Sequence, residues 1–355
     1  MDKKVNGKWF YACLLMLLFA SGLQAQQAQT FKQHDMHRWG IPAGNYSGIA
    51  HIGNDRYSLI SDKQQADGWT EVSIAFLPSG DIASMQFVSH HYDANTLGHA
   101  RDSEGIAYVP GHGFFVSAEN DQQILELSSE GTPTGRRLQI PPCFAPSQIF
   151  PNRGFEALAY DAGQGIFWTT TEHSLRPDAL EPASPQLPQP ALLRLQSFGS
   201  DLRPLRQFAY RTEFPTSGGT FRHFAFGVPE LLVIDDTTLL VLERELSVPQ
   251  RRLRSKCTVR LFSVNPHARM ALTDTDIPLD SLSSDRFLPK KQLFALQTGV
   301  RLFGKKDFAN YEGMCQGPTL PDGRRTILLV ADSQNRAGTS VFRLKDYIRV
   351  IVLEP

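Results

Sequence analysis

Acidic residues recur at the same two places of a pattern that this sequence repeats five times. Each copy starts with an acidic or small polar residue, continues through an apolar segment, a turn and a second apolar segment, and closes on an acid. The leading residues are Ser47, Glu104, Glu156, Glu230 and Glu312. The closing residues, 13 to 20 positions later, are Asp62, Glu119, Glu172, Glu243 and Asp332. Carboxylates that a fold brings together in this way can bind a divalent cation.

Carboxylates that gather at one point require a positive charge, because two of them about 4 Å apart repel by about 4 kcal/mol at an effective dielectric of about 20. An all-oxygen site favours Ca²⁺, followed by Mg²⁺ or Mn²⁺, and the lack of clustered His and Cys argues against zinc or copper. The predicted metal ligands are Glu104, Glu156, Glu230, Glu312, Glu119, Glu172, Glu243 and Asp332, with Asp62 in the second set. The alternative is a network of carboxylates with nearby basic residues, namely Arg101, Arg153, Arg222, His223 and Arg244.

The elements that must position these acids are β-hairpins. In each copy, β-branched and aromatic residues flank a turn, and two further apolar segments follow, so that each unit predicts a four-stranded antiparallel sheet. The leading residues are 57, 52, 74 and 82 positions apart. Sheets repeated at this spacing predict an all-β fold, a β-propeller, in preference to a pair of β-sandwiches, because a closed ring protects the sheet edges. Since the first strands of all blades run in one direction along the channel, the leading and closing acids should meet at one channel mouth.

The repeat predicts the type of fold but leaves the number of blades open between five and six. Five copies are visible, and the two long intervals leave room for a degenerate sixth blade. A strand near residues 31–38 is predicted to complete the last blade and close the ring. Helical periodicity is limited to residues 281–297, which argues against a parallel α/β fold.

The first 25 residues differ from the rest of the chain. Lys3, Lys4 and Lys8 precede an apolar run over residues 10–20, and small or polar residues follow as far as Ala25. This order is typical of a secretory signal peptide, and the run is shorter than the roughly 20 residues that span a bilayer. We expect cleavage near Ala25 and an exported, periplasmic or extracellular monomer without membrane insertion, in which residues 26–355 form a single propeller domain.

The composition excludes several classes of protein. The chain of 355 residues has 36 Lys and Arg against 36 Asp and Glu, which argues against a nucleic-acid partner. With 41% hydrophobic and 20% charged residues, it fits neither a disordered chain nor a coiled coil. The exported part keeps Cys143, Cys257 and Cys315, which leaves open either one disulfide with one buried thiol or three unpaired core thiols.

The residues around the predicted mouth are suited to phosphoester hydrolysis. Arg101, Arg153 and Arg222 can grip non-reacting phosphate oxygens through forked hydrogen bonds, and His173 and His223 are candidates to protonate the leaving oxygen. A serine esterase is the competing chemistry, but the GxSxG turn is absent from the sequence, as are GxxxxGK[ST] and GxGxxG.

Four segments resemble the family described as having esterase-like activity of phytase. They are SEGIAYVPGHGFFVSAEN from Ser103, RGFEALAYDAGQGIFWTTTEHSL from Arg153, GVPELLVIDDTTLLVLERE from Gly227 and NYEGMCQGPTLPDGRRTILLVADSQN from Asn310. The resemblance spans residues 47–344, and the last segment, with its LPDGR turn, is the most specific. It implies an exported propeller that hydrolyses phosphate or other esters of a small-molecule substrate, with calcium as the expected metal.

A non-enzymatic propeller is the alternative function. Its channel mouth would bind a glycan, a peptide or a phosphorylated ligand. The proline-rich stretch over residues 177–190 is predicted to be a solvated loop between two blade strands, with a recognition or lid segment as the other interpretation.

Overall fold

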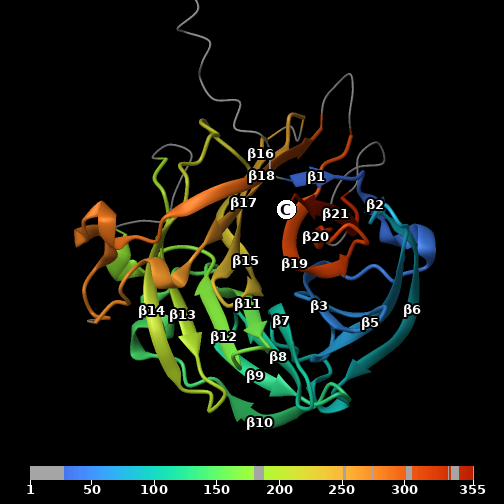
Figure 1. Ribbon diagram of the computed structural model, residues 1–355, viewed down its shortest axis with the longest axis horizontal. Helices are drawn as coiled ribbons and strands as arrows, with labels where there is room; N and C mark the ends of the chain where they lie inside the picture. Colours follow the sequence, from blue (N-terminus) through green and yellow to red (C-terminus); the bar gives the residue numbers. More distant parts are fainter. Residues whose placement is uncertain are drawn as a thin grey trace, which may run out of the picture.

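A computed structural model describes residues 28–179, 188–250, 253–273, 275–300, 306–334, 336 and 344–354. These residues form five antiparallel sheets around a common centre, which is a five-bladed β-propeller (Figure 1). The prediction of an all-β propeller is confirmed, and five is the number of blades. Within the described ranges there is no α-helix, and the helical elements are short 3-10 turns.

In blades 1 to 4, the order of the strands along the chain is also their order in the sheet. Blade 1 contains β3 (Tyr46–Gly53), β4 (Arg56–Ser61), β5 (Gly68–Phe76) and β6 (Ile82–Tyr92), and blade 2 contains β7 (Ser103–Val109), β8 (Gly113–Ala118), β9 (Gln123–Leu127) and β10 (Pro133–Arg137). Blade 3 contains β11 (Phe155–Asp161), β12 (Ile166–Thr171), β13 (Leu192–Phe198) and β14 (Pro204–Arg211), and blade 4 contains β15 (His223–Asp235), β16 (Thr238–Val248), β17 (Lys256–Val264) and β18 (Lys290–Gly299).

Blade 5 joins the two ends of the described chain. It contains β19 (Asn310–Thr319), β20 (Arg325–Asp332), β21 (Tyr347–Leu353) and the short strands β1 (Ala28–Thr30) and β2 (His34–Asp35), both paired with β21. Ala28 lies opposite Leu353, and His34 lies opposite Ile348. An N-terminal segment therefore closes the ring as predicted, although it does so as two short strands followed by a 3-10 helix rather than as one strand over residues 31–38.

The two long intervals of the repeat, from Glu156 to Glu230 and from Glu230 to Glu312, contain connecting segments and no sixth sheet among the described residues. The 3-10 helices are η1 (Met36–Trp39), η2 (Ala94–Thr96), η3 (Pro142–Phe144), η4 (Pro146–Gln148), η5 (Arg176–Asp178), η6 (Pro266–Ala268), η7 (Leu279–Ser281) and η8 (Ser284–Arg286). The predicted helical periodicity over residues 281–297 is wrong, because β18 occupies its second half and pairs with β17 from Lys290 to Gly299. Pairing with a neighbouring strand outweighs a weak local helical pattern.

An apolar cluster fills the space between each pair of neighbouring blades. Blade 2 shows how one strand serves two clusters: Phe114 packs with Ile60 of blade 1, whereas Phe115 packs with Phe167 of blade 3. Successive side chains of a strand point to opposite faces of a sheet. The near-continuous apolar strands of the repeat are therefore explained by burial on both faces.

Glycines directly after the leading residues let the innermost strands approach closely. A Cβ atom on Gly48 would lie 2.7 Å from the carbonyl oxygen of Glu104, and one on Gly105 would lie 2.2 Å from that of Glu156. Any larger residue would force these strands apart. The glycines thus bring the leading residues of blades 1, 2 and 3 side by side around the channel.

The remaining predictions concern the cysteines, membrane insertion, the signal peptide and the proline-rich stretch. Cys143, Cys257 and Cys315 are all free, so that the alternative with three unpaired thiols holds. No helix in the described ranges is long and apolar enough to cross a membrane. The predicted signal peptide lies outside the described residues, and so do residues 180–187 of the proline-rich stretch.

Candidate functional site

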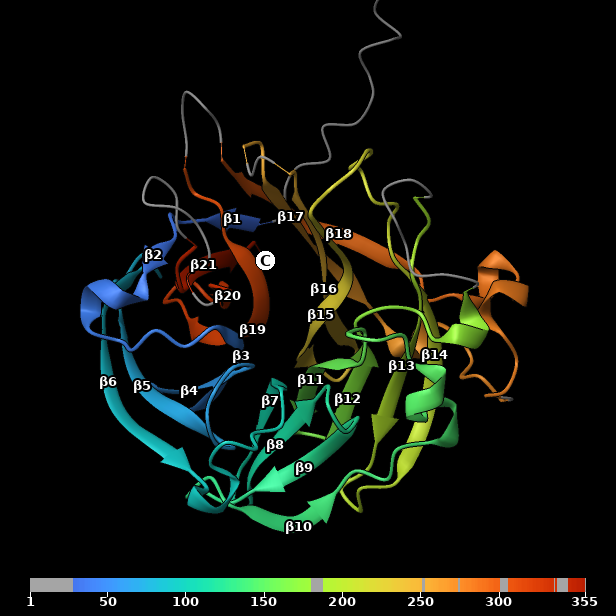
Figure 2. The ribbon, with the colours of Figure 1, turned by 180° about the vertical axis from the view of Figure 1, so that it is seen from behind.

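A central cavity of about 460 Å³ lies inside the ring of blades. The first strands of the five blades surround this centre (Figure 2). Each of them, β3, β7, β11, β15 and β19, contacts its neighbours around the ring. Seven carboxylates line this cavity: Asp62, Asp102, Glu104, Glu119, Glu156, Glu172 and Glu312. The basic residues along its wall are Lys63, Arg153, Arg244 and His223. Acids that are up to 250 positions apart in the chain therefore meet in one space.

Six of the nine acids singled out by the repeat lie in this cavity. Three are leading residues and three are closing residues, and they are Glu104, Glu156, Glu312, Asp62, Glu119 and Glu172. The cavity walls come from the ends of strands where the leading and closing positions of a hairpin meet, as the topology requires. Whether these residues bind a metal remains a prediction.

Glu230 lies outside the cavity wall, contrary to the predicted ring. Its Oε1 accepts hydrogen bonds from the backbone N–H groups of Leu158 and Leu231, each at 3.0 Å, and burial raises its pKa well above the usual range. The pairing of β15 with β16 shifts register between Gly227 and Glu230. Glu104, Glu156 and Glu312 lie within the corresponding irregularities of their strands, whereas Glu230 lies after the one in β15 and pairs with Leu242. Glu230 therefore sits deeper along its strand, where it joins the first strands of blades 3 and 4.

Glu243 is also displaced from the predicted ring. It accepts hydrogen bonds from the Tyr210 hydroxyl at 2.6 Å and from the Glu213 N–H at 2.9 Å, and it forms an ion pair with Lys290 at 2.7 Å. These partners hold it between blades 3 and 4. Glu243 and Arg244 are adjacent on β16, so that their side chains point to opposite faces of the sheet. Arg244 is therefore the residue of this strand that faces the cavity.

Asp332 and Ser47 border the cavity without lining it. Asp332 is buried, accepts a hydrogen bond from the Gln334 N–H at 2.7 Å, and has a pKa raised well above the usual range by burial and by the charges of Glu312 and Asp62. The Ser47 hydroxyl donates to the Ser103 carbonyl oxygen at 3.2 Å. The leading position of blade 1 thus links two blades instead of adding a carboxylate.

Blades 3 to 5 form what we name the arginine side of the cavity, which consists of Arg153, Arg244, Glu172 and Glu312. Arg244 donates to one oxygen of Glu172 and to one oxygen of Glu312, while Arg153 donates to the other oxygen of Glu172 at 2.6 Å. Burial opposes ionisation of Glu172, but the two guanidinium groups outweigh it and lower its pKa. On this side, buried ion pairs compensate the carboxylates.

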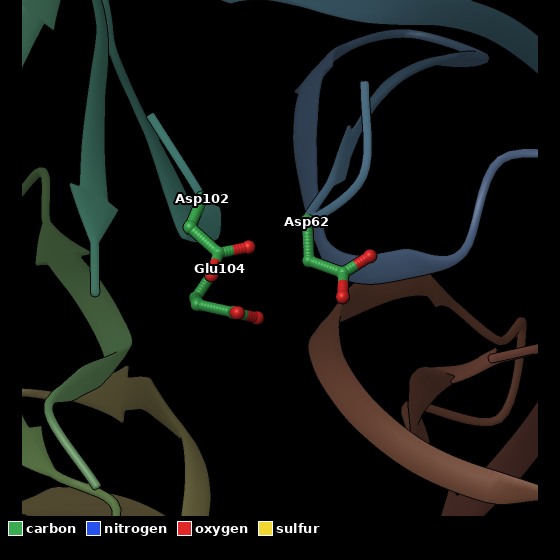
Figure 3. Close-up of side chains that lie close together, drawn as sticks. All are labelled: Asp62, Asp102 and Glu104. Carbon is green, nitrogen blue, oxygen red and sulfur yellow. The ribbon is translucent and has the colours of Figure 1, made fainter. Parts of the chain in front are cut away.

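Blades 1 and 2 form the lysine side, which consists of Lys63, Asp62, Asp102 and Glu104. Oxygens of the three carboxylates lie within 4.8 Å of one another (Figure 3). Lys63 Nζ lies 2.9 Å from Asp62 and 2.8 Å from Asp102. One ammonium group thus faces three carboxylates, which leaves negative charge uncompensated when all three are ionised.

The protonation equilibria of the lysine side reflect this imbalance. Burial, partly offset by Lys63, raises the pKa of Asp62. Burial and the charge of Glu156 raise the pKa of Glu104 well above the usual range. Asp62 Oδ1 is buried and has no hydrogen-bond partner among the described residues. A buried carboxylate oxygen without a donor is costly, so that a bound cation would stabilise this side.

Glu119 and Glu156 lie between the two sides. Glu119 accepts a hydrogen bond from the Gly154 N–H at 2.7 Å, and burial together with the charge of Glu172 raises its pKa to about 7. Burial and the same neighbour raise the pKa of Glu156 well above the usual range. The pKa of Glu312 on the arginine side is also raised to about 7, by burial. Several carboxyl groups can therefore hold a proton near neutral pH.

Of the three arginines predicted to bind phosphate, one lines the cavity. Arg153 lines it, but Arg101 is bound through two nitrogens to Asp121 outside it, at 2.8 and 2.9 Å. Arg222 is exposed and does not line the cavity. Arg101 lies three residues before Glu104, and β7 begins between them at Ser103. The spacing in the sequence therefore does not fix the direction in which the Arg101 side chain points.

The two predicted histidines have very different environments. His223 is exposed on the cavity wall and stays a candidate proton donor. His173 is buried, packs against Phe226 with ring centroids 6.4 Å apart, and does not line the cavity. Burial lowers its pKa to about 4. Its place outside the cavity wall favours His223 over His173 for this role, which stays a prediction.

The sequence did not single out several polar residues of the cavity, among them Asp102, Lys63 and Asn310. Asp102 lies two positions before Glu104, on the same face of an extended segment, and Lys63 directly follows the closing Asp62. Asn310 donates to Glu312 at 2.8 Å and accepts from Arg244 at 3.1 Å. The spacing of two residues was a usable signal for Asp102, whereas nothing in the sequence distinguishes Lys63 from a solvated lysine.

Solved structures with a similar fold are distant in sequence. The catalytic domain of a GH62 α-L-arabinofuranosidase from Coprinopsis cinerea is 11% identical, with 92% of this chain and 98% of that chain covered and a TM-score of 0.46. The tail fibre of Staphylococcus aureus phage P68 is 12% identical, with 97% and 56% covered and a TM-score of 0.41. A streptogramin B lyase is 11% identical, with 92% and 99% covered and a TM-score of 0.34. Similarity at this level carries no argument about function.

The sequence matches a described family over most of its length. No curated protein matches this chain. The family of phytase-like proteins described as "esterase-like activity of phytase" matches residues 41–334, which include all five leading and all five closing positions of the repeat. The chain therefore belongs to the phytase-like family that carries this description.

Proposed function

We propose that this protein is an exported, calcium-dependent hydrolase of phosphate esters or related esters, which acts in the central cavity. The observation that carries the proposal is the lysine side. There, three carboxylates within 4.8 Å of one another face a cavity of about 460 Å³ with a single lysine to balance them. Membership of a family named for esterase-like activity supports the reaction class.

The lysine side fits a calcium ion in the chemistry of its donors. Ca²⁺ prefers six to eight oxygen ligands, many of them carboxylate. Asp62, Asp102 and Glu104 offer oxygen donors alone, and one buried oxygen of Asp62 has no hydrogen-bond donor in the described part of the chain. The chemistry that such an ion would supply is neutralisation of a substrate phosphate and a lower pKa for a bound water.

The residues of the cavity would bind and orient the substrate. Lys63 has a side chain that is 49% exposed, so that its ammonium group can turn from the carboxylates toward an anionic ligand. Arg153 has a side chain that is 19% exposed and adds a second cation on the opposite side. Glu119, with a pKa of about 7, is suited to exchange a proton with the reacting ester near neutral pH. His223 is the other candidate for this step.

The test measures metal content and turnover in the same samples. Purified protein is incubated with a phosphomonoester, a phosphodiester and a carboxylic ester, first with calcium and then with a chelator. We expect turnover of at least one ester that chelation abolishes and calcium restores. Asp62→Asn and Glu104→Gln should each lower calcium affinity at least tenfold, because each removes one charged donor.

Glu130→Gln provides the control. Glu130 is an exposed acid in blade 2 and lies away from the cavity, so that its substitution should change neither calcium affinity nor turnover. Hydrolysis that persists in the chelator would refute the calcium dependence. Inactivity on all three esters, with calcium bound, would instead support the non-enzymatic binding propeller.

A further inference from the structure

A second cavity of about 690 Å³ lies beside the central one, along blade 1. We name it the blade 1 groove. Its walls come from the segment before β3 and from the facing parts of β5 and β6. Lys63 lines both cavities, so that the groove continues from the lysine side. Its volume falls in the range of small-molecule sites, roughly 300 to 1,000 Å³.

The groove differs from the central cavity in charge. Among the described residues, none of those that line it is an aspartate or a glutamate. Its permanent cations are Arg336 and Lys63, the second of which also pairs with Asp62 and Asp102 of the central cavity, and His90 and His91 line the groove as well. A space that is lined by cations and lacks carboxylates attracts an anion, whereas the carboxylate-rich central cavity attracts a cation.

The groove also presents rings and apolar surface. Tyr92 is 57% exposed and Leu97 is 60% exposed, so that both large side chains present apolar surface. Trp69, which also lines the groove, stacks on His91 with ring centroids 4.1 Å apart and planes 10° apart. His91 is held in turn by Ser89 at 2.7 Å and by Glu71 at 3.2 Å. These contacts fix the two rings in the wall of the groove.

We propose that the blade 1 groove binds a small anionic ligand with a planar ring, which is the part of the substrate that leaves when the ester in the central cavity is cleaved. The ring would lie against Tyr92 and Leu97, and Lys63 and Arg336 would face its negative charge. The link to ester cleavage rests on the proposed function, but binding in the groove does not. Charge complementarity and continuity through Lys63 carry the proposal.

The test measures binding without turnover, by isothermal titration calorimetry of the full chain with 4-nitrobenzoate. This probe has a ring and a charge but no ester. We expect it to bind, and we expect Tyr92→Ala to weaken binding about fivefold, because ring contacts of this kind contribute about 0.5–1.5 kcal/mol. Uncharged 4-nitrobenzyl alcohol and ring-free acetate should each bind more weakly than 4-nitrobenzoate.

Phe214→Ala is the matched control. Phe214 is a 60% exposed aromatic residue that lines neither the groove nor the central cavity. Its substitution should leave the affinity within twofold of the wild type. Equal affinities for the wild type and Tyr92→Ala, or no binding of 4-nitrobenzoate at millimolar concentration, would overturn the proposal. Groove binding in a protein that cleaves no ester would refute the proposed function and leave the groove intact.

Discussion

The arginine side and the lysine side of the central cavity carry similar acids with different counter-charges. On the arginine side, two carboxylates share two guanidinium groups, and Arg244 is only 4% exposed. On the lysine side, one ammonium group, 49% exposed, pairs with two of the three carboxylates. Guanidinium groups in a buried fork fix carboxylates in place, whereas a lysine on a flexible stem leaves them accessible.

This difference assigns one role to each side. The sequence left a choice between a metal site and a network of arginines and carboxylates. The arginine side has the second arrangement, in which Arg153 and Arg244 bind Glu172 and lower its pKa, although burial raises the pKa of Glu312. The lysine side retains a buried oxygen of Asp62 that has no hydrogen-bond donor in the part of the chain that the structure describes, which supports placing the proposed calcium ion there.

Removal of Arg244 should have the largest effect. Arg244→Gln would leave Glu172 and Glu312 buried with one counter-charge fewer, and loss of one partner from a buried ion pair costs about 3–5 kcal/mol. We expect the free energy of unfolding to fall by this amount in urea denaturation. Arg325→Gln is the control, because Arg325 pairs with Asp235 at 3.3 Å on the surface and should contribute at most about 1 kcal/mol. Equal losses for both variants would contradict a structural role for the arginine side.

The pH dependence of stability should have an intermediate effect. The folded pKa values of Glu119 and Glu312, about 7, exceed the value of about 4.3 in an unfolded chain. Between these values the folded protein binds more protons than the unfolded chain, so that the free energy of unfolding falls as pH rises. Glu172, whose folded pKa is lowered, is ionised in both states above about pH 5 and does not cancel this trend.

The measurement is urea denaturation in chelator at several values between about pH 5 and pH 8. We expect a loss of at least about 1 kcal/mol over this range, which corresponds to a little less than one pKa unit. Glu119→Gln should flatten the curve, since it removes one titrating group, and added calcium should stabilise the protein most at high pH. A free energy of unfolding that rises over this range would contradict the assignment of raised pKa values.

Removal of the lysine should have the smallest effect on stability and a distinct effect on calcium. Lys63→Gln removes a positive charge that competes with a cation for Asp62 and Asp102. A like charge about 4 Å away costs about 1 kcal/mol in a water-like dielectric, so that calcium affinity should rise about fivefold in titration calorimetry. The control is Lys345→Gln, because Lys345 pairs with Asp35 at 2.7 Å and is similarly exposed. An unchanged or weaker affinity in Lys63→Gln would place calcium elsewhere.

The repeat predicted the fold and the gathering of acids because both follow from local patterns. Alternating apolar segments and turns specify hairpins, and a repeated hairpin places its two ends at one edge of each blade. Glu104, Glu156 and Glu312 were therefore predictable as neighbours, together with Asp62, Glu119 and Glu172. The failure at Glu230 has an equally local cause, because Glu230 lies after the irregularity of its strand whereas Glu104, Glu156 and Glu312 lie within theirs. The position of such an irregularity leaves no clear mark in the sequence.

By itself, the sequence determined the all-β class, the repeated sheets and the presence of carboxylates at matched places, since these depend on residue type and spacing alone. Only the tertiary structure decided which acid meets which cation. Arg244 reaches Glu172 and Glu312 across blades, 72 and 68 positions away, and a change of one position on a strand turned Glu243 out of the cavity. Contacts between blades depend on the exact register and on the closure of the ring, and neither is encoded by any single stretch of the chain.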